Sequence, residues 1–203
     1  MAWQTPVGRH KGYDRQEVLE AAMGVFWRYG YNGTSTQQLV DHLGINRNSM
    51  YSEFGSKQEL FEAAIGYYEK TVIERNYGPL ETKIAGLKEI AALFDHYARV
   101  AKEKDADYGC LLCNTAVEMS GKDQRSRAAA DRFMARITAA FANAISNAKA
   151  QNQLRPRTDV AEQAEFLTSS CLGMLVLLRS KAQPKLLASS ARVVRRHLDG
   201  LKR

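Results

Sequence analysis

A short polar segment at residues 46–51 carries the side chains best suited to contact a nucleic acid. It reads Asn-Arg-Asn-Ser-Met-Tyr. An arginine guanidinium can donate two hydrogen bonds to guanine, and an asparagine amide can pair in the same way with adenine. On a helix, Arg47, Asn48 and Ser49 would be the outward residues of the first turn, whereas Tyr51 is better placed to reach a phosphate. The segment therefore predicts a surface that reads DNA.

Two short helices with a tight turn between them would position these side chains. A capping box of Ser35 and Gln38 begins the first helix, and Gly44 stands where that helix must stop. Asn46 is suited to cap the second helix. The inward faces carry the apolar residues Leu39, Val40, Leu43, Met50 and Phe54. This pattern is typical of a helix-turn-helix, whose second helix enters a DNA groove; the alternative is a polar helix pair on the surface of an all-helical protein.

Two further residues are placed to bind the phosphate backbone beside this motif. Thr36 opens the first helix, where its hydroxyl and a backbone N–H could bind a phosphate at the positive helix end. Lys57 falls in the first turn of the following helix, which Ser56 and Glu59 would cap. Residues 1–12 are either a disordered terminus or a flexible arm that contacts DNA.

The rest of the chain follows a helical pattern. Apolar residues recur at three- and four-residue intervals, and no strand-like alternation of useful length occurs. We expect an all-α fold of about nine helices. Its parts would be a three-helix DNA-binding domain with its arm at 1–55, a connecting helix at 56–78 that ends at about Asn76, and a larger helical domain at 79–203. In that domain we expect a loop at 105–109 and helices at 110–120 and 124–152.

The chain is basic, but the predicted motif is not. The sequence has 29 Lys and Arg against 22 Asp and Glu, which gives a net charge of +7. Before residue 55 the balance is five basic against five acidic residues, and the excess lies later in the chain. Net charge therefore gives weak support for a nucleic-acid partner.

A Cys-x-x-Cys pair, Cys110 and Cys113, begins the helix expected at 110–120. A helix N-terminus lowers the pKa of a thiol, so the pair could sense oxidants or electrophiles. Alternatively, both cysteines are small buried hydrophobes beside two leucines. A zinc site would need two more ligands, for which His96 is the nearest candidate, so no metal is predicted.

The C-terminal domain has enough apolar and aromatic residues to line a pocket for a small molecule. The candidates for this lining are Phe94, Tyr97, Cys113, Val117, Phe133, Ile137 and Met174. Each of them could equally belong to the core.

A subunit interface is indicated by residues 171–178, which are apolar on every side of their helix. The alternative is a central core helix. A two-fold dimer would place two recognition helices one DNA turn or a multiple apart, about 34–36 Å. The residues expected at its interface are Phe166, Cys171, Met174, Leu178, Val194 and Leu198.

The sequence lacks the signatures of common enzymes and of membrane proteins. No Gly-x-Gly-x-x-Gly, Gly-x-x-x-x-Gly-Lys, Gly-x-Ser-x-Gly or His-Glu-x-x-His occurs, so we expect no enzyme and no cofactor. The longest apolar run is eight residues, and a spanning helix needs roughly 20, so no membrane partner is expected. Three cysteines and the lack of an apolar leader favour the reducing cytoplasm.

Residues 13–68 resemble the TetR family of transcriptional regulators. The resemblance is carried by Val18–Ala22, Phe26 with Tyr29–Tyr31, Gly33–Thr36, Leu39 with Leu43–Ile45, and above all Ser49–Phe61. It covers about a quarter of the chain strongly. Beyond it, Gly109–Thr115 with Glu118 looks like the segment that opens a helix in one branch of that family.

This resemblance implies a homodimer formed by the last two helices, a ligand cavity in the C-terminal domain, and a repressor. The repressor would leave a palindromic or pseudo-palindromic double-stranded operator when an unknown small molecule binds. The implied contacts are Thr36, Tyr51 and Lys57 with phosphates, and Arg47, Asn48 and Ser49 with bases. Asn48 and Ser49 depart from the Gly or Ala often found there, which leaves the operator sequence open. The alternatives are a thiol-based redox or electrophile sensor and a helical protein that mainly binds a small molecule.

Overall fold

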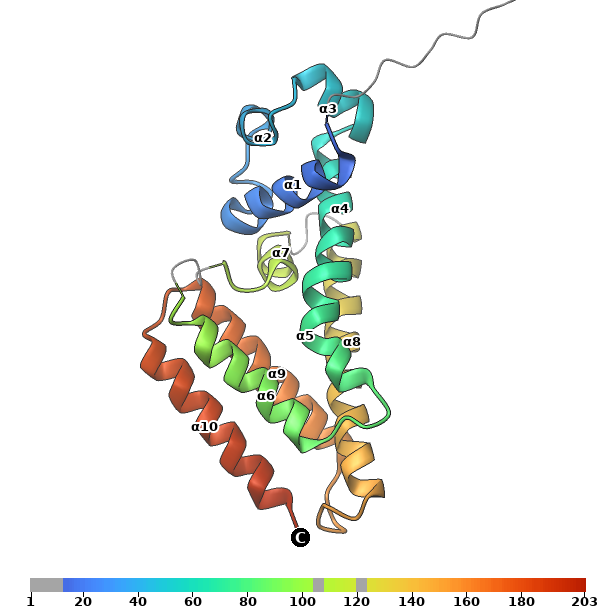
Figure 1. The fold of residues 1–203 in the computed structure, drawn as a ribbon, viewed down its shortest axis with the longest axis vertical. Coiled ribbons are helices and arrows are strands. Elements are labelled where there is room, and N and C mark those ends of the chain that lie inside the picture. Colours follow the sequence, from blue (N-terminus) through green and yellow to red (C-terminus); the bar gives the residue numbers. More distant parts are fainter. Residues whose placement is uncertain (1–12, 104–107, 120–123) are drawn as a thin grey trace, which may run out of the picture.

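A computed structural model describes residues 13–103, 108–119 and 124–203, and its regular structure is helical (Figure 1). The helices are α1 (Arg15–Tyr29), α2 (Thr36–Leu43), α3 (Arg47–Phe54), α4 (Lys57–Tyr68), α5 (Glu74–Glu81), α6 (Leu87–Val100), α7 (Leu111–Met119), α8 (Gln124–Ala150), α9 (Val160–Arg179) and α10 (Pro184–Leu201). A π-helical turn, Glu69–Ile73, joins α4 to α5. When α4, the π-helical turn and α5 are counted as one continuous helix, the described ranges contain nine helices. The predicted all-α fold is confirmed.

The expected helix boundaries are close to the observed ones. Asp159 caps α9 by accepting a hydrogen bond from the Glu162 N–H at 3.0 Å. The predicted arm at residues 1–12, most of the loop at 105–109 and the end of the helix expected to reach residue 120 lie outside the described residues. Within the described residues, no helix combines the length and apolar character that a membrane span requires.

The first three helices form a small domain on the beginning of α4, at one end of the molecule (Figure 1). Phe26 of α1 is fully buried and meets Phe61 of α4 edge to face, with ring centroids 4.9 Å apart. Aromatic pairs in this geometry add to the free energy gained by burying their area. This contact between α1 and α4 fixes the small domain on the connecting helix.

The connecting helix is longer than the sequence predicted. It continues to Glu81, with Pro79 inside its last turn, instead of ending at about Asn76. A proline beyond the first turn removes one backbone donor and crowds the preceding turn, so the sequence predicted that the helix would end before it. The side-chain amide of Asn143 donates to the carbonyl oxygens of Leu80 and Thr82, at 2.8 and 2.9 Å, and so satisfies this helix end.

An arginine on α8 holds the connecting helix in place. The guanidinium of Arg136 donates to Glu74 and Glu81 on α5, each at 2.6 Å. These hydrogen bonds raise the pKa of the guanidinium, and the bond from Arg136 lowers the pKa of Glu81.

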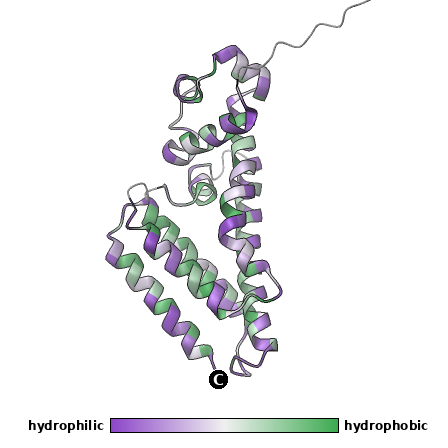
Figure 2. Ribbon diagram, in the orientation of Figure 1, coloured by the Kyte–Doolittle hydropathy of each residue, from purple (hydrophilic) through white to green (hydrophobic). Residues whose placement is uncertain are grey.

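The larger domain packs α6, α8, α9 and α10 with their apolar residues facing one another, and the residues at the helix surfaces are more hydrophilic (Figures 1 and 2).

Candidate nucleic-acid interface

The predicted helix-turn-helix is present as α2, a three-residue turn and α3. Both hydrogen bonds of the Ser35–Gln38 capping box form, at 3.1 and 2.8 Å. Gly44 has φ +63°, a left-handed conformation that glycine adopts without steric cost and that turns the chain sharply. Asn46 caps α3 by accepting a hydrogen bond from the Ser49 N–H at 2.8 Å. Local sequence signals therefore fix where α2 ends and where α3 begins.

The far end of α3 is anchored to α1 by a buried carboxylate. The Glu53 side chain is 8% exposed and forms an ion pair with the Arg15 guanidinium at 3.2 Å. It also accepts a hydrogen bond from the Tyr13 hydroxyl at 3.4 Å. The same guanidinium lies 5.3 Å from the centroid of the Phe54 ring. These contacts and the buried Met50 hold the inner side of α3 in a fixed orientation.

The outer side of α3 carries the residues predicted to read bases. Arg47, Asn48 and Tyr51 are exposed, and Ser49 is half-buried. Thr36, at the first position of α2, is also half-buried. The structure therefore brings five of the six predicted DNA contacts to the surface of one motif, where donors to bases and phosphates lie close together.

Lys57 is positioned differently from the prediction. Its ammonium lies 4.2 Å from the centroid of the Tyr31 ring, a cation–π contact. Burial lowers its pKa, and the negative charge of Glu118 partly opposes this effect. The ammonium thus contributes to packing between α4 and the α1–α2 loop in this structure.

The contacts that join the two domains could not be predicted from the sequence. The Glu118 carboxylate on α7 accepts hydrogen bonds from the N–H groups of Tyr31 and Asn32, at 3.0 and 2.6 Å. At the C-terminal end of α9, the Arg179 guanidinium donates to the backbone carbonyls of Trp27 and Arg28, at 3.2 and 3.0 Å. We call these two groups of hydrogen bonds the interdomain clamp. It fixes both the end of α1 and the loop that leads into α2.

A third interdomain hydrogen bond lies beside the clamp. The Trp27 indole N–H donates to the Gly109 carbonyl at 3.2 Å. Residue 109 immediately precedes Cys110, the residue before α7. The beginning of α7 is therefore in direct contact with α1.

A cavity of about 510 Å³ lies where α1, α4–α5, α6, α7 and α9 meet. Its size is within the range usual for small-molecule sites. Burial, followed by the charges of Arg99 and Arg75, lowers the pKa of the lining residue His96, so its ring is neutral at pH 7. The aromatic lining consists of Trp27, Tyr68, Tyr77, Tyr97 and Tyr108, and the polar lining includes Arg75, Asn76, His96 and Glu103.

The lining of this cavity differs from the set of residues that the sequence predicted. Of the seven residues expected to line a ligand pocket, only Tyr97 lines this cavity. Val117 is 78% exposed, so it faces away from the interior. The remaining five are buried and lie outside the lining of this cavity: Phe94, Cys113, Phe133, Ile137 and Met174. Of these, Phe133 lines a separate hollow of about 400 Å³. The cavity includes side chains from α1 and from the connecting helix. Helical periodicity shows which residues share a face of one helix, but it does not show which helices meet around a cavity.

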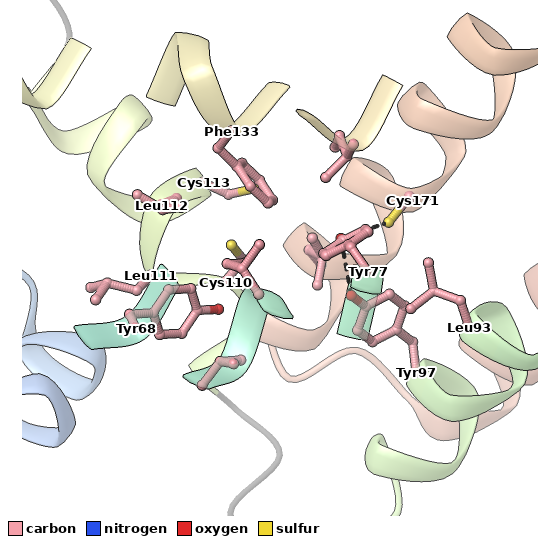
Figure 3. Packing of buried hydrophobic residues seen from close by; sticks show 14 of the residues in the cluster. Tyr68, Tyr77, Leu93, Tyr97, Cys110, Leu111, Leu112, Cys113, Phe133 and Cys171 are labelled. Carbon is pink, nitrogen blue, oxygen red and sulfur yellow. Dashed lines mark hydrogen bonds between the residues drawn. The ribbon is translucent and has the colours of Figure 1, made fainter. Parts of the chain in front are cut away.

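The three cysteines lie in one buried cluster with three tyrosines (Figure 3). The Tyr97 hydroxyl donates to the Tyr77 hydroxyl at 3.0 Å, and that hydroxyl lies 3.3 Å from the Cys171 sulfur. Figure 3 shows the Tyr68 hydroxyl directed toward Cys110, which lies beside Cys113. Within the described residues, no group of three His, Cys, Asp or Glu side chains is arranged to hold a metal ion.

Most residues predicted for a dimer interface belong to the core of the subunit. Cys171, Met174, Leu178, Val194 and Leu198 are between 0% and 5% exposed, which corrects that assignment. The apolar segment 171–178 of α9 packs inside the subunit, where α9 contacts α6, α8 and α10. Phe166 alone of the six is exposed, at 41%. The exposed apolar residues on α9 and α10 are Phe166, Val176, Leu186 and Val193.

Two family profiles match the chain. Residues 18–64 match the profile described as bacterial regulatory proteins, tetR family. Residues 86–194 match the profile described as tetracyclin repressor-like, C-terminal domain. The two matches coincide with the helix-turn-helix end of the molecule and with the larger helical bundle.

Curated relatives match over most of the chain. An uncharacterized HTH-type transcriptional regulator of Bacillus subtilis (strain 168), YezE, is 32% identical over 181 residues, which cover 87% of this chain and 91% of the relative. The HTH-type transcriptional repressor ComR of Escherichia coli (strain K12) is 29% identical over 86% of this chain and 84% of its own length.

Solved structures share the fold. A cysteine mutant of the TetR family transcriptional regulator CifR, complexed with 26-base-pair double-strand operator DNA, has a TM-score of 0.79 and 24% identity. That match covers 93% of this chain and 98% of the CifR chain. A TetR transcriptional regulator from Chloroflexus aurantiacus J-10-FL has a TM-score of 0.82 and 22% identity over 93% of this chain and 96% of that chain.

Proposed function

Because this chain belongs to the TetR family of transcriptional regulators, we propose that it is a repressor that binds operator DNA as a homodimer and leaves it when a small molecule binds. The observation that carries the proposal is the physical link between a helix-turn-helix and a cavity: α7 and α9 both line or border the cavity and both hold the end of α1. The proposed place of action is the cytoplasm, where bacterial DNA is accessible.

We assign base recognition to the first turn of α3. Arg47 and Asn48 are exposed there, and a good bidentate contact contributes about 1–3 kcal/mol of discrimination between bases. Ser49 would read a neighbouring base edge. Thr36 and Tyr51 would bind phosphates and so fix the register of the motif on the duplex.

Lys57 would join these phosphate contacts only after leaving the Tyr31 ring. Its ammonium contacts that ring at 4.2 Å in the present arrangement, and Glu118 lies close enough to affect its pKa. The proposed movement exchanges a cation–π contact for a charge-assisted hydrogen bond to a phosphate. DNA binding and the Glu118 contacts would thereby influence one another.

The proposed dimer would use the exposed stripes of α9 and α10. On α9, Phe166, Gly173 and Val176 follow helical spacing and are exposed. On α10, Leu186 and Val193 are seven residues apart and about half exposed, at 48% and 49%. Apolar residues on one face of a helix favour burial against a partner. A second copy of this chain, related by two-fold symmetry, would cover both stripes and double the number of DNA contacts.

The small molecule would act through the interdomain clamp. The cavity is lined by several aromatic rings and by the first residues of the α7 segment, so an apolar or aromatic compound filling it would press on α7 and α9. Movement of either helix changes the hydrogen bonds that hold α1 and its following loop. Coupling between two sites typically amounts to about 1–3 kcal/mol, or roughly 5–150-fold in affinity.

The direct test selects genomic DNA fragments that bind the full-length protein at two salt concentrations. We expect a selected sequence with two-fold symmetry, and an affinity that falls steeply with salt because phosphates release counterions. A double variant, Arg47→Ala with Asn48→Ala, should no longer select a specific DNA sequence. It should keep the thermal stability of the wild type, since both side chains are exposed. If the wild-type protein selects no sequence, the protein is a small-molecule-binding helical protein rather than a repressor.

A further inference from the structure

One cysteine of the buried cluster borders the cavity. Cys110 is among the residues that line the 510 Å³ space, together with Trp27, Tyr68 and Tyr108. The residue is 2% exposed, so it is shielded from bulk solvent. The other two cysteines do not line the cavity.

The position of Cys110 before α7 favours the thiolate form. Burial alone would raise the pKa of this thiol. Hydrogen bonds from the Cys113 thiol, the Tyr68 hydroxyl and the N–H groups of Cys113 and Leu112 outweigh that effect, and the net result is a lowered pKa. The Asn114 N–H donates to the Cys110 carbonyl at 2.9 Å, as expected of a residue at a helix N-cap.

The neighbouring thiols have the opposite tendency. A hydrogen bond to the Cys110 sulfur, followed by burial, raises the pKa of Cys113 far above its ordinary value. Burial raises the pKa of Cys171 to about 12. Cys110 is the one cysteine of the three that lines the cavity, so it is the thiol that a compound in the cavity would meet.

We propose that Cys110 is a covalent modification site for small α,β-unsaturated carbonyl compounds that enter the cavity, and that the resulting adduct releases the protein from DNA. The second part rests on the proposed repressor function. In the reaction the sulfur forms a bond with the β-carbon, the π electrons of the C=C bond move to the α-carbon, and the thiol proton ends on that carbon. No oxidant or reductant is needed. An uncharged, planar electrophile suits the aromatic walls formed by Trp27, Tyr68 and Tyr108.

The adduct would act on DNA binding through the residue next to Cys110. Gly109 has φ +63°, and a Cβ built on it would lie 2.8 Å from the Leu175 carbonyl oxygen and 2.9 Å from the Arg179 Cβ. The backbone there is thus packed tightly against α9, beside the arginine of the interdomain clamp. Its carbonyl also accepts the hydrogen bond from Trp27 on α1. Atoms added to the sulfur would occupy the cavity beside the beginning of α7, next to these contacts, and would press on them.

The test uses the full-length protein with methyl vinyl ketone as the probe. Intact-mass analysis and peptide mapping should show one adduct per subunit, on Cys110. Operator affinity, measured by fluorescence anisotropy on the selected DNA, should fall at least about tenfold on modification. Cys110→Ser, which keeps an N-cap oxygen, should bind DNA like the wild type and be unaffected by the probe. Cys171→Ser, the matched control at a cysteine outside the cavity, should react and respond like the wild type.

Several results would overturn the proposal. It is wrong if the folded wild type acquires no adduct on Cys110, or if a mapped Cys110 adduct leaves operator affinity unchanged. If Cys110→Ser does not fold, adduct mapping and anisotropy on the wild type and on Cys171→Ser still decide the question. Failure of the repressor function can be told apart from failure of this proposal. If the protein is not a repressor, no operator is selected before any probe is added, and the mass measurement by itself then tests Cys110 as the modification site.

Discussion

The interdomain clamp predicts a measurable loss of stability when Glu118 is changed to Gln. The carboxylate accepts two backbone N–H groups, those of Tyr31 and Asn32, at 3.0 and 2.6 Å. A hydrogen bond to a charged group contributes about 1.5–3 kcal/mol. Glutamine keeps one oxygen as a neutral acceptor, worth about 1 kcal/mol, and turns an N–H toward the second donor.

The size of the effect follows from solvent access to the clamp. Losing one charged hydrogen bond and weakening the other would cost about 2–4 kcal/mol at a fully buried site. Glu118 is half-buried and Asn32 is exposed, so water replaces part of the loss. We therefore expect a decrease of about 1–2 kcal/mol in the free energy of unfolding, and a decrease of about 2–8 °C in Tm for a chain of this size.

Urea unfolding of matched variants checks this estimate. Glu62→Gln is the control, because its ion pair with Arg125 at 3.1 Å involves an arginine side chain that is 72% exposed, and such pairs contribute about 0–1 kcal/mol. Hydrogen exchange should also become faster at Tyr31 and Asn32 in Glu118→Gln, and not in the control. If the two variants have the same midpoint and the same exchange at these amides, the clamp contributes no free energy and the reasoning fails.

Three further predictions concern DNA, assembly and pH. Arg47→Ala should weaken operator binding by about 1–3 kcal/mol per half-site in anisotropy titrations, whereas Lys83→Ala, an exposed lysine between α5 and α6, should not; equal losses would contradict base reading by α3. Val176→Glu, at a side chain that is 56% exposed on α9, should give monomers in light scattering, and Ile84→Glu, at 85% exposure, should stay dimeric; a dimeric Val176→Glu protein would place the interface elsewhere. A hydrogen-bonded guanidinium lowers the pKa of Glu81 below its ordinary 4.5, so its stabilisation is present above that pH and is lost as pH falls through the folded-state value. The difference in urea midpoint between wild type and Glu81→Gln should thus be present at pH 7 and shrink as the pH falls below 4.5; a difference that does not change with pH would refute this.

The helix-turn-helix could be predicted in detail because its determinants are local. Ser35 and Gln38, or Asn46 and Ser49, are three residues apart, and such caps form in the helix they begin. The turn depends on one glycine. Anchoring of α3 by Glu53 could not be predicted, because its partner Tyr13 lies 40 positions away and nothing in the local pattern pairs them.

The interdomain clamp and the cavity were less predictable for the same physical reason. Glu118 and Tyr31 are 87 positions apart, and the cavity combines side chains from α1, the connecting helix and α9. Periodicity identified residues 171–178 as apolar on every side but could not say which side faces the subunit core. Consequently Cys171 and Leu198, both expected at the dimer surface, are buried within the subunit, and the exposed Val176 was overlooked.

The central claim is that two copies of α3 read one operator at a fixed separation. The most direct measurement compares the selected operator with a version that carries an insertion of about half a helical turn, roughly five base pairs, at its centre. The insertion rotates one half-site to the opposite face of the duplex, so we expect nearly all specific affinity to be lost at constant salt. Binding that is unchanged by the insertion would contradict a dimer that holds its recognition helices at a fixed spacing.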